Sequence, residues 1–360
     1  MRVLVVTTWY PSPSAPESGA FIQRDVRMLR ERHDVRVLHL AQPGIETGVE
    51  DDDGVPVTRV TMRRSSPIAV RRARRAVREA AVGVELVHSM SISSLLPLSR
   101  GVGLPWVHTE HWSALLAPET APLAARLVGG VLVRRLGRPE VVVAVSDALA
   151  RLIARYRRGP IEVIPNAVPA PTSRRHAGEA ERVRLVSVGG LIERKRPLMA
   201  VAVVDELRRR GRDASLVLVG DGPLRAAVEQ DVRARGLDGA VRLAGTIAPD
   251  EVSAYLADAD VFFTATRSET FGVAIAEALR HGLPVVAGGE GGHREFIGPA
   301  DGVLVDSDTP PAYADAVESA LALAADGDAI ARRAEERFSD AARQDAYDAV
   351  YRLAVERRAA

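Results

Sequence analysis

The sequence predicts an α/β protein made of two facing, doubly wound parallel-sheet (Rossmann-like) domains, and three observations lead to this prediction. Apolar strand candidates alternate with helical patterns along the chain, which is typical of a mainly parallel sheet with helices on both faces. The alternation pauses once, in a proline-containing stretch at 164–181, and then restarts. The two parts also differ in charge, because residues 1–165 contain 23 basic and 16 acidic side chains and residues 166–360 contain 25 and 31.

Length and composition exclude several classes of protein. At 360 residues the chain is long enough for two domains, and its 47% hydrophobic and 26% charged residues are ordinary for a soluble globular protein. It contains no cysteine, which excludes disulfides, thiolate catalysis and cysteine-ligated metal. The apolar run at 1–8 is short and no small-residue cleavage site follows it, so we expect a strand there and no signal peptide. No apolar run reaches the roughly 18 residues of a membrane span, and we therefore expect a cytoplasmic protein.

The first domain is expected to comprise residues 1–165. Its strand candidates are short apolar runs at 3–7, 35–40, 57–60, 86–88, 106–109, 141–145 and 161–164. Helical spacing of apolar residues predicts helices over 20–32, 70–81 and 147–155. Asp34 and the stretch 51–54 are predicted turns.

The second domain is expected to comprise residues 166–340. Strand candidates lie at 185–188, 216–219, 241–243, 261–264 and 285–287. Helices are predicted over 197–210, 223–235, 250–257, 272–280, 310–325 and 329–357. The last of these carries Tyr347, Val350, Tyr351 and Ala354 at helical spacing.

The stretch 266–280 places two glutamates, Glu269 and Glu277, on either side of a helix start. Gly272 lacks a Cβ, so a ligand can approach the backbone closely there. The free amides at a helix N-terminus carry partial positive charge and accept phosphate. The alternative is a plain strand–turn–helix with two solvated carboxylates.

The loop at 188–197 contains the only lysine of the chain. It ends a strand with Gly189 and Gly190, continues through Arg194 and Lys195, and meets a helix at Pro197. Cations at this position would neutralise a leaving diphosphate. A solvated basic loop is the alternative, but 47 of the 48 basic residues are arginine, and an ammonium binds phosphate as a compact point charge.

Other signals are weaker. The Gly-Asp-Gly-Pro turn at 220–223 is a weak nucleotide signal, since such turns are common in doubly wound sheets. Either Glu110 or His111 is expected to face the cleft between the domains; His108 and His111 lack an evident third ligand, so we expect no metal. The acid pairs at 258–260 and 306–308 resemble cation-binding Asp-X-Asp pairs but are interpreted as turn acids. Residues 17–21 fit a plain helix start or a helix N-terminus that approaches a diphosphate at Gly19.

A dense arginine cluster occurs in the basic half. It fits either a solvated face or contact with anionic lipid or an anionic acceptor, and we expect no nucleic-acid partner. The cluster comprises Arg63, Arg64, Arg71, Arg72, Arg74, Arg75 and Arg78. If the lipid interpretation holds, the protein lies peripherally at the inner face of the membrane.

Taken together and in order, these segments resemble the retaining nucleotide-sugar glycosyltransferases of family 4, which have the GT-B fold. The glutamate pair around Phe-Gly is the most specific member of the set. The resemblance covers nearly the whole chain, through Gly19, His111, Ser146-Asp147, 163–166, the Lys195 loop, 219–223, Gly245, Asp250-Glu251, 269–277 and 282–286.

The resemblance implies roles for the matching residues. Glu277 would hold the ribose hydroxyls of the donor, and Glu269 would contact the donor sugar. Lys195 would bind the diphosphate, and His111 would lie near the reacting centre. The other implied donor contacts are Gly19, Gly189, Arg194, Gly222, Thr246 and Ile247 (near the base), and the amides of Phe271, Gly272 and Val273. The helix at about 341–360 would return to complete the first domain.

The chain departs from the family at Gly190, where an arginine is common; Arg194 can replace it only if its side chain turns inward. The implied reaction moves a hexose-type sugar from a UDP- or GDP-sugar to a hydroxyl of a lipid-linked glycan, polysaccharide or small natural product. It retains the anomeric configuration and needs no metal or other cofactor. Acceptor contacts are implied for 9–18, 89–96 and 112–118, and domain closure around the donor is expected. The alternatives are a sugar-nucleotide epimerase or phosphorylase of the same fold, and a non-catalytic sugar-nucleotide-binding protein.

Overall fold

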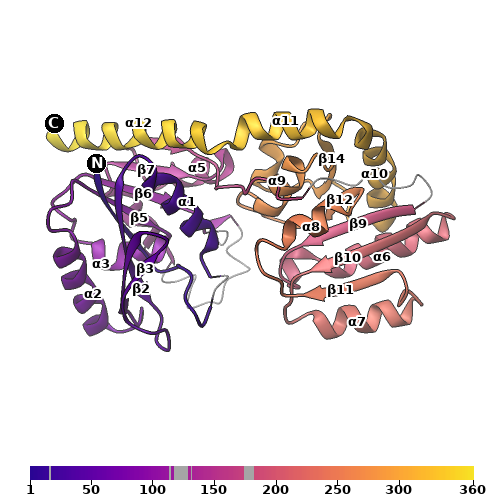
Figure 1. Ribbon diagram of the computed structural model, residues 1–360, viewed down its shortest axis with the longest axis horizontal. Coiled ribbons are helices and arrows are strands. Elements are labelled where there is room, and N and C mark those ends of the chain that lie inside the picture. Colours follow the sequence, from indigo (N-terminus) through magenta and orange to yellow (C-terminus); the bar gives the residue numbers. More distant parts are fainter. Residues whose placement is uncertain (16–17, 113–114, 117–128, 131, 174–181) are drawn as a thin grey trace. The chain divides into compact units, whose positions relative to one another are not determined.

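The computed structural model describes residues 1–15, 18–112, 115–116, 129–130, 132–173 and 182–360. It divides into two compact units, unit 1 with Met1–Ala167 and Asp340–Ala360, and unit 2 with Val168–Ser339. Each unit is a parallel or mainly parallel sheet with helices on both faces (Figure 1). The predicted fold class of two doubly wound parallel-sheet α/β domains is thereby confirmed. The unit limits lie next to those expected from the sequence, 165/166 and 340/341.

Unit 1 contains an eight-stranded sheet in the order β3-β4-β2-β1-β5-β6-β7-β8. The strands are β1 (Arg2–Thr7), β2 (Asp34–Ala41), β3 (Gly48–Asp52), β4 (Val55–Thr61), β5 (Leu86–Met90), β6 (Trp106–Glu110), β7 (Val141–Ala144) and β8 (Ile161–Val163). Their apolar, β-branched runs suit strands that are buried on both faces. Strand β3 was not predicted: the turn expected over 51–54 is confined to residues 53–54, and 51–52 belong to the strand. This edge strand is polar and mostly exposed, so no hydrophobic pattern marks it, and it pairs antiparallel with β4 alone.

Helices cover both faces of this sheet. The helices are α1 (Ala20–Arg30), α2 (Pro67–Ala80), α3 (Leu95–Leu98), α5 (Asp147–Ile153) and α12 (Asp340–Ala359), with short 3₁₀ turns η1 (Ile92–Ser94) and η4 (Arg134–Gly137). On one face, α1 and α12 pack together over β1, β6 and β7 (Figure 1). On the other face, α2 lies against β2, β4 and α3. The short α3 was not expected from the sequence.

Helix α12 buries the four residues whose helical spacing marked it in the sequence. Its Arg343 is 1% exposed and forms an ion pair with Asp25 of α1, which is also 1% exposed. The guanidinium also donates to the Pro165 carbonyl oxygen at 2.9 Å. The predicted single helix over 329–357 is wrong, since Ser339 has an extended backbone that separates α11 from α12.

Unit 2 contains a six-stranded, fully parallel sheet in the order β11-β10-β9-β12-β13-β14. The strands are β9 (Arg182–Val188), β10 (Asp213–Val219), β11 (Val241–Gly245), β12 (Val261–Thr264), β13 (Val285–Gly288) and β14 (Gly302–Val305). Strand order reverses between β9 and β12, and in such sheets ligands bind beside this point, outside the carboxyl ends of the strands.

The helices of unit 2 lie on both faces of its sheet. They are α6 (Pro197–Arg209), α7 (Arg225–Ala234), α8 (Val252–Ala257), α9 (Val273–Arg280), α10 (Pro310–Leu323) and α11 (Gly327–Phe338), with 3₁₀ turns η5 (Glu193–Lys195), η6 (Gly292–Glu295) and η7 (Ala324–Asp326). Helices α6, α7 and α10 share one hydrophobic core with the sheet. Helix α11 packs against α9. In the described ranges, no helix of either unit is long and apolar enough to cross a membrane.

Candidate functional site

Glu269 is the centre of a charged cluster at the carboxyl edge of the unit 2 sheet. Its Oε2 accepts hydrogen bonds from Lys195 Nζ at 2.6 Å, from Arg194 Nη1 at 3.0 Å and from Thr266 Oγ1 at 3.3 Å. The Glu269 side chain is only 11% exposed. Burial opposes its ionisation, but the charges of Lys195 and Arg194 outweigh burial and lower the pKa of Glu269 to about 2. Glu269 is therefore ionised at neutral pH.

The arrangement of neighbouring strands explains this meeting of distant residues. Strand β12 pairs with β9, so the loop after β12 and the loop after β9 emerge side by side. The two loops are joined by a hydrogen bond from the Arg267 amide to the Arg194 carbonyl oxygen, 3.1 Å long. Arg196 adopts a left-handed backbone (φ 52°) that ends the first loop and starts α6 at Pro197. The Arg194 side chain turns inward and contacts Glu269. This is the orientation that it needs in order to replace the arginine that the family commonly has at position 190.

Two glycines of the turn at 220–223 are required by close packing. A Cβ at Gly220 would lie 2.2 Å from the Gly189 carbonyl oxygen, and one at Gly222 would lie 2.6 Å from the Leu191 carbonyl oxygen. Gly189 lies against the Lys195 side chain, where a Cβ would be 3.4 Å from Cε. At Gly190, by contrast, a Cβ would meet nothing closer than the Asp221 carbonyl oxygen at 3.5 Å. The absence of a side chain at Gly222 thus lets the turn at 220–223 pack directly against the Lys195 loop.

The turn from Glu269 into α9 exposes backbone donors. Gly272 adopts a left-handed conformation (φ 94°) and caps the helix. The amides of Phe271, Gly272 and Val273 donate to no other residue in the described part of the chain. The Phe271 ring points away from these amides into an aromatic cluster, 5.0 Å from the ring of Phe296 and 5.7 Å from that of Phe338. Phe271 can therefore contribute to binding through its backbone alone.

The remaining predicted residues of unit 2 lie further from this cluster. Glu277 is buried one turn into α9, at 8% exposure. Thr246 and Ile247 follow β11, the outermost strand, whose end is tied to β10 by a 2.8 Å hydrogen bond from the Gly220 amide to the Gly245 carbonyl oxygen. The structure brings Arg194, Lys195, Glu269 and Gly272 together directly. Two of the others, Thr246 and Ile247, lie at the same edge of the sheet but further along it. Glu277 lies in α9, the helix that Gly272 caps.

A loop that was not predicted from the sequence supports Glu269 from the other side. After β13, Gly291 bridges to Glu269, and the Gly292 amide donates to the Glu269 carbonyl oxygen at 2.7 Å. His293 is fully buried beneath this loop and donates through Nε2 to the Gly288 carbonyl oxygen at 2.6 Å. The four glycines at 288, 289, 291 and 292, directly after a strand, were the signal that identifies this loop.

In unit 1, His111 follows β6 and lies against the ring of Phe21, 4.9 Å between ring centroids. Its Nδ1 donates to Asn166 Oδ1 at 2.8 Å. Burial lowers the pKa of His111, and Asp25 and Glu110 oppose this effect only in part, so the imidazole is neutral at pH 7. His111 is therefore a neutral imidazole held in one orientation.

Glu110, the other residue of this pair, does not present its carboxylate to a ligand. Its side chain is fully buried, and Oε1 accepts the backbone amides of His111 at 2.9 Å and Trp112 at 2.8 Å. Its Oε2 lies 3.2 Å from His108 Nε2. Because it turns back onto the chain, Glu110 positions the His111 backbone and is not available to a ligand.

Gly19 is the left-handed N-cap of α1 (φ 76°). A Cβ there would lie 2.6 Å from the Trp9 carbonyl carbon, so only glycine allows α1 to start against the loop after β1. Glu17, expected beside Gly19, lies outside the described residues, as do parts of the acceptor stretches 9–18 and 112–118.

No group of three or more His, Asp or Glu side chains in the described ranges is arranged to hold a metal ion. Both predicted acid pairs are engaged by arginine. Asp258 and Asp260 each accept a hydrogen bond from Arg184 at 2.9 Å, and Asp308 accepts one from Arg196 at 2.6 Å. Whether the reaction needs a metal stays a prediction.

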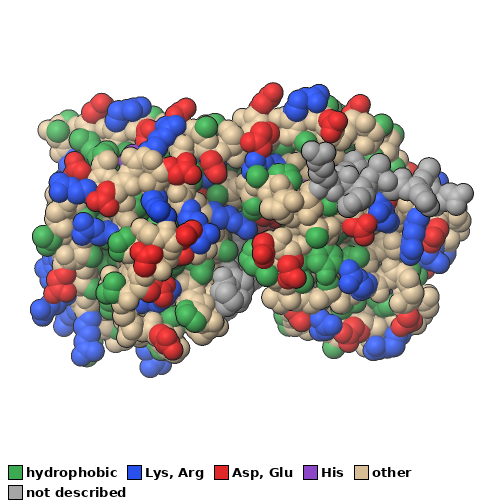
Figure 2. All heavy atoms as spheres, viewed as in Figure 1, with side chains coloured by type: hydrophobic (Ala, Val, Ile, Leu, Met, Phe, Trp, Pro, Cys, Tyr) green, Lys and Arg blue, Asp and Glu red, His purple; other side chains and the backbone are tan. Residues whose placement is uncertain are grey.

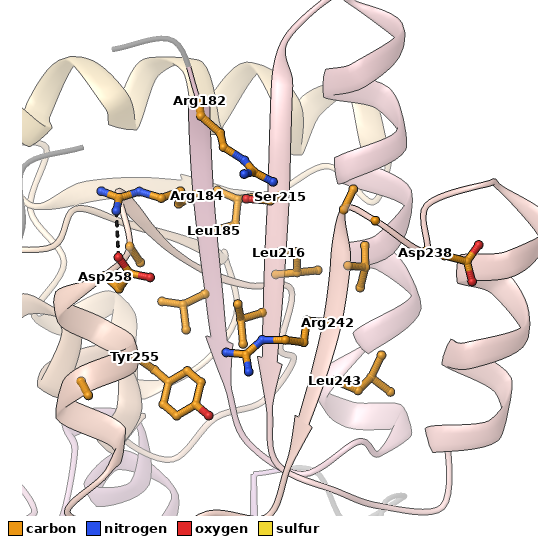
Figure 3. A pocket seen from close by; sticks show the side chains of 17 residues that line it. Arg182, Arg184, Leu185, Ser215, Leu216, Asp238, Arg242, Leu243, Tyr255 and Asp258 are labelled. Atoms are coloured by element: carbon orange, nitrogen blue, oxygen red, sulfur yellow. Dashed lines mark hydrogen bonds and ion pairs between the residues drawn. The ribbon is translucent and has the colours of Figure 1, made fainter. Parts of the chain in front are cut away.

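A cavity of about 740 Å³ lies apart from the predicted donor residues (Figure 3). It is lined by residues of β9, β10 and β11 and by residues of α8. In Figure 3, Arg184 forms an ion pair with Asp258, and the Arg242 guanidinium lies 5.3 Å from the centroid of the Tyr255 ring. Asp258 and Asp260 pair with Arg184, and none of the predicted site residues lines this cavity.

The arginine cluster is only partly available to a partner, which corrects the grouping of seven. Arg74 turns inward and donates to the Pro97 carbonyl oxygen at 3.0 Å and to Ser99 Oγ at 2.8 Å. Arg75 pairs with Glu79 at 2.7 Å. Arg63, Arg71, Arg72 and Arg78 remain exposed. Figure 2 shows Lys and Arg side chains gathered where α2 lies.

Two family models match the chain. The model of Glycosyltransferase Family 4 matches residues 20–170, and that of Glycosyl transferases group 1 matches residues 182–322. D-inositol 3-phosphate glycosyltransferase of Kineococcus radiotolerans is 32% identical over 297 residues, 71% of this chain and 68% of that protein. 2-deoxystreptamine glucosyltransferase of Streptomyces kanamyceticus is 29% identical over 220 residues, 56% of this chain and 57% of that protein. Over several relatives the chain spans about six tenths of their length, between 57% and 62%.

The fold also occurs in solved structures. Anabaena HepE in complex with UDP and glucose superposes with a TM-score of 0.75 at 18% identity, covering 96% of this chain and 98% of that one. Both halves of the chain match family models, and the relative from Kineococcus radiotolerans extends across most of both. The chain therefore belongs to glycosyltransferase family 4 and has the GT-B fold.

Proposed function

We propose that this protein transfers a hexose-type sugar from a UDP- or GDP-linked donor to a hydroxyl acceptor, with retention of the anomeric configuration and without a metal. The observation that carries the proposal is the cluster of Lys195, Arg194 and Glu269 beside the free amides at the start of α9. Family membership supports transfer from a nucleotide-sugar, and the glutamate pair with the Lys195 loop supports the family's way of holding the donor.

In this proposal the free protein keeps its phosphate-binding cations paired with Glu269. Lys195, Arg194 and Glu269 together carry one net positive charge. An arriving diphosphate replaces the carboxylate as partner of the two cations, which favours an anionic ligand. Glu269 is then released as an ionised acceptor, suited to hydroxyl groups of the donor sugar. Glu277 remains the proposed ligand of the ribose.

The chemical step follows from this charge arrangement. The anomeric C–O bond breaks, and negative charge develops on the diphosphate, where Lys195, Arg194 and the α9 amides stabilise it. The acceptor oxygen attacks from the same face and passes its proton to the leaving phosphate oxygen. His111, a neutral imidazole, is the residue of unit 1 that we propose contacts the transferred sugar.

The alternatives are less well supported. The epimerase and phosphorylase hypotheses gain nothing from the relatives, which are named as transferases. The non-catalytic hypothesis rested on Gly190, but Arg194 turns inward and supplies a cation at the same loop.

We also propose that α2 contacts an anionic membrane through Arg63, Arg71, Arg72 and Arg78. Ile68 in the first turn of α2 and Val82 just after its end are 63% and 73% exposed and add apolar contact. Sedimentation with phosphatidylcholine vesicles, with and without an anionic lipid, tests this. Equal binding to both vesicle types would contradict it.

A donor screen tests the proposed function. UDP, GDP, ADP and dTDP are compared by thermal shift, since a ligand of the folded state raises the melting temperature. The matching nucleotide-sugars are then incubated with candidate acceptors in the presence of EDTA, and the product anomer is assigned by NMR. We expect one nucleotide to stabilise the protein and the product to keep the donor's anomeric configuration. A protein that binds no nucleotide, or that inverts the anomer, would contradict the proposal.

A further inference from the structure

Arg64 lies in an unusual setting at the carboxyl edge of the unit 1 sheet. It follows β4, while Gln42 follows β2 and Trp9 follows β1, and these three strands are parallel neighbours. The Arg64 Cζ lies 5.9 Å from the centroid of the Trp9 ring. Once the Gln42 amide is oriented with its oxygen toward the donors of Arg64, that oxygen accepts hydrogen bonds from Arg64 Nε and Nη2, each 2.7 Å long. A ring and an amide thus hold the guanidinium in a fixed position.

This held cation has no counter-ion. Three other held arginines do have one: Arg59 pairs with Glu50, Arg343 with Asp25, and Arg184 with Asp260. Arg74 and Arg157 also lack an ion pair among the described residues, but main-chain carbonyl oxygens accept their hydrogen bonds. No carboxylate in the described part of the chain forms an ion pair with Arg64. Protein packed against one side of the guanidinium lowers the pKa of Arg64 by burial, and no nearby acid opposes that effect. A partly desolvated charge without a partner is costly, and an anionic ligand would offset that cost.

The other side of Arg64 remains exposed to solvent, and the Trp9 ring beneath it is 45% exposed. A guanidinium offers phosphate a planar, bidentate set of donors. An aromatic ring offers an apolar face to the C–H groups of a sugar or cyclitol. One ligand that carries both a phosphate and a polyol ring would use both features.

We propose that Arg64, with Trp9 and Gln42, binds the phosphate of an anionic acceptor, a phosphorylated polyol that is either free or the headgroup of a lipid. This rests on the proposed function and names the acceptor class for it. The named relatives span two acceptor chemistries, because one acts by name on D-inositol 3-phosphate and the other on 2-deoxystreptamine, an amine. A cation without a counter-ion at this edge favours the phosphate and repels the amine.

Calorimetry with three soluble probes tests the charge preference: D-inositol 3-phosphate, unphosphorylated inositol and 2-deoxystreptamine. We expect the phosphorylated probe to bind most tightly. Arg64→Gln should weaken its binding by about 10- to 100-fold, the range expected when hydrogen bonds to a charged group are lost. Arg155→Gln is the matched control, because Arg155 is an exposed arginine of unit 1 at the end of α5 and pairs with no described acid. It should leave the affinity unchanged.

Vesicles distinguish the two sources of the phosphate. Phosphatidylcholine vesicles with and without phosphatidylinositol are compared for the unaltered protein, Arg64→Gln and Arg155→Gln. If Arg64→Gln loses phosphatidylinositol-dependent vesicle binding and Arg155→Gln keeps it, the phosphate belongs to a lipid headgroup. If Arg64→Gln loses binding of D-inositol 3-phosphate but not of vesicles, the acceptor is free. Equal affinity for phosphorylated and unphosphorylated inositol, or a preference for the amine, overturns the inference.

Nucleotide binding is measured in the same samples, which separates this inference from the proposed function. If the nucleotide binds normally but the phosphate preference is absent, the inference alone fails. If the unaltered protein binds no nucleotide, the proposed function fails instead.

Discussion

Replacing Lys195 with alanine removes the ammonium that lies 2.6 Å from Glu269 Oε2. In the proposed reaction this positive charge stabilises the negative charge that develops on the leaving diphosphate. Loss of one preorganised donor to a developing anion lowers turnover by about 10²- to 10³-fold, or about 2.7–4 kcal/mol of transition-state stabilisation. We therefore expect Lys195→Ala to abolish measurable transfer in an ordinary assay.

The fold should survive this change. Glu269 keeps Arg194 Nη1 at 3.0 Å and Thr266 Oγ1 at 3.3 Å, so its carboxylate stays partnered. Removing the sole partner of a buried charge costs about 3–5 kcal/mol. Since one cation remains and the Lys195 side chain is 24% exposed, we expect a smaller loss, about 1 kcal/mol of unfolding free energy.

The assay is the initial rate of nucleoside-diphosphate release at saturating donor and acceptor, with circular dichroism melting on the same samples. Arg196→Gln is the matched control, because this neighbouring cation pairs with Asp308 and does not contact Glu269. We expect it to keep its turnover. A folded Lys195→Ala variant with the turnover of the unaltered protein would refute the reasoning.

Three further predictions follow from named contacts. Because Glu269 has its pKa lowered from 4.5 to about 2 in the folded state, its contribution to stability is full above pH 4.5. That contribution, about 3 kcal/mol at most, is lost as the pH falls to 2; urea unfolding across this range should show the loss, and Glu269→Gln should flatten it. Arg194→Gln should weaken nucleoside-diphosphate binding, measured by calorimetry, about tenfold. Adding Gly190→Arg to this variant should restore most of the lost affinity. No recovery would show that position 190 does not reach the diphosphate. Arg343→Met should destabilise unit 1 by about 3–5 kcal/mol in urea unfolding, because Asp25 is left buried and unpaired; the double variant Arg343→Met with Asp25→Leu should regain most of this, and equal loss in both would contradict a buried ion pair.

Secondary structure was predictable for most elements whose burial leaves a periodic pattern, although the short apolar strand β14 was not among the predicted strands. Strand β12 was expected with the observed limits, and the buried residues of α12 were identified from their spacing. Strand β3 was missed because an exposed edge strand needs no apolar residues. The break between α11 and α12 was missed because Ser339 changes only its backbone conformation, while the helical pattern continues on both sides.

The candidate site was predictable residue by residue but not in its internal contacts. Glu269, Lys195 and Arg194 were each identified from local motifs. Their pairing was not, since 74 residues separate Lys195 from Glu269 and only the adjacency of β9 and β12 brings them together. The sequence left Glu110 and His111 as alternative ligand contacts because the two residues are adjacent at the end of β6, whereas the Glu110 carboxylate turns back to the amides of the following turn.

The sequence by itself determined the alternation of strands and helices, the place where the chain divides, and the motifs that identify the family. These properties depend on local periodicity and on residue types at short spacing. Only the tertiary structure decided which charges are neutralised and which are not. In the tertiary structure Glu269 pairs with Lys195 and Arg194, and Arg74 points inward. Arg64 lies against Trp9 and forms no ion pair with a described acidic residue. The physical reason is that the order of strands in a sheet sets which loops meet at its edge, and this order depends on the packing of the whole chain.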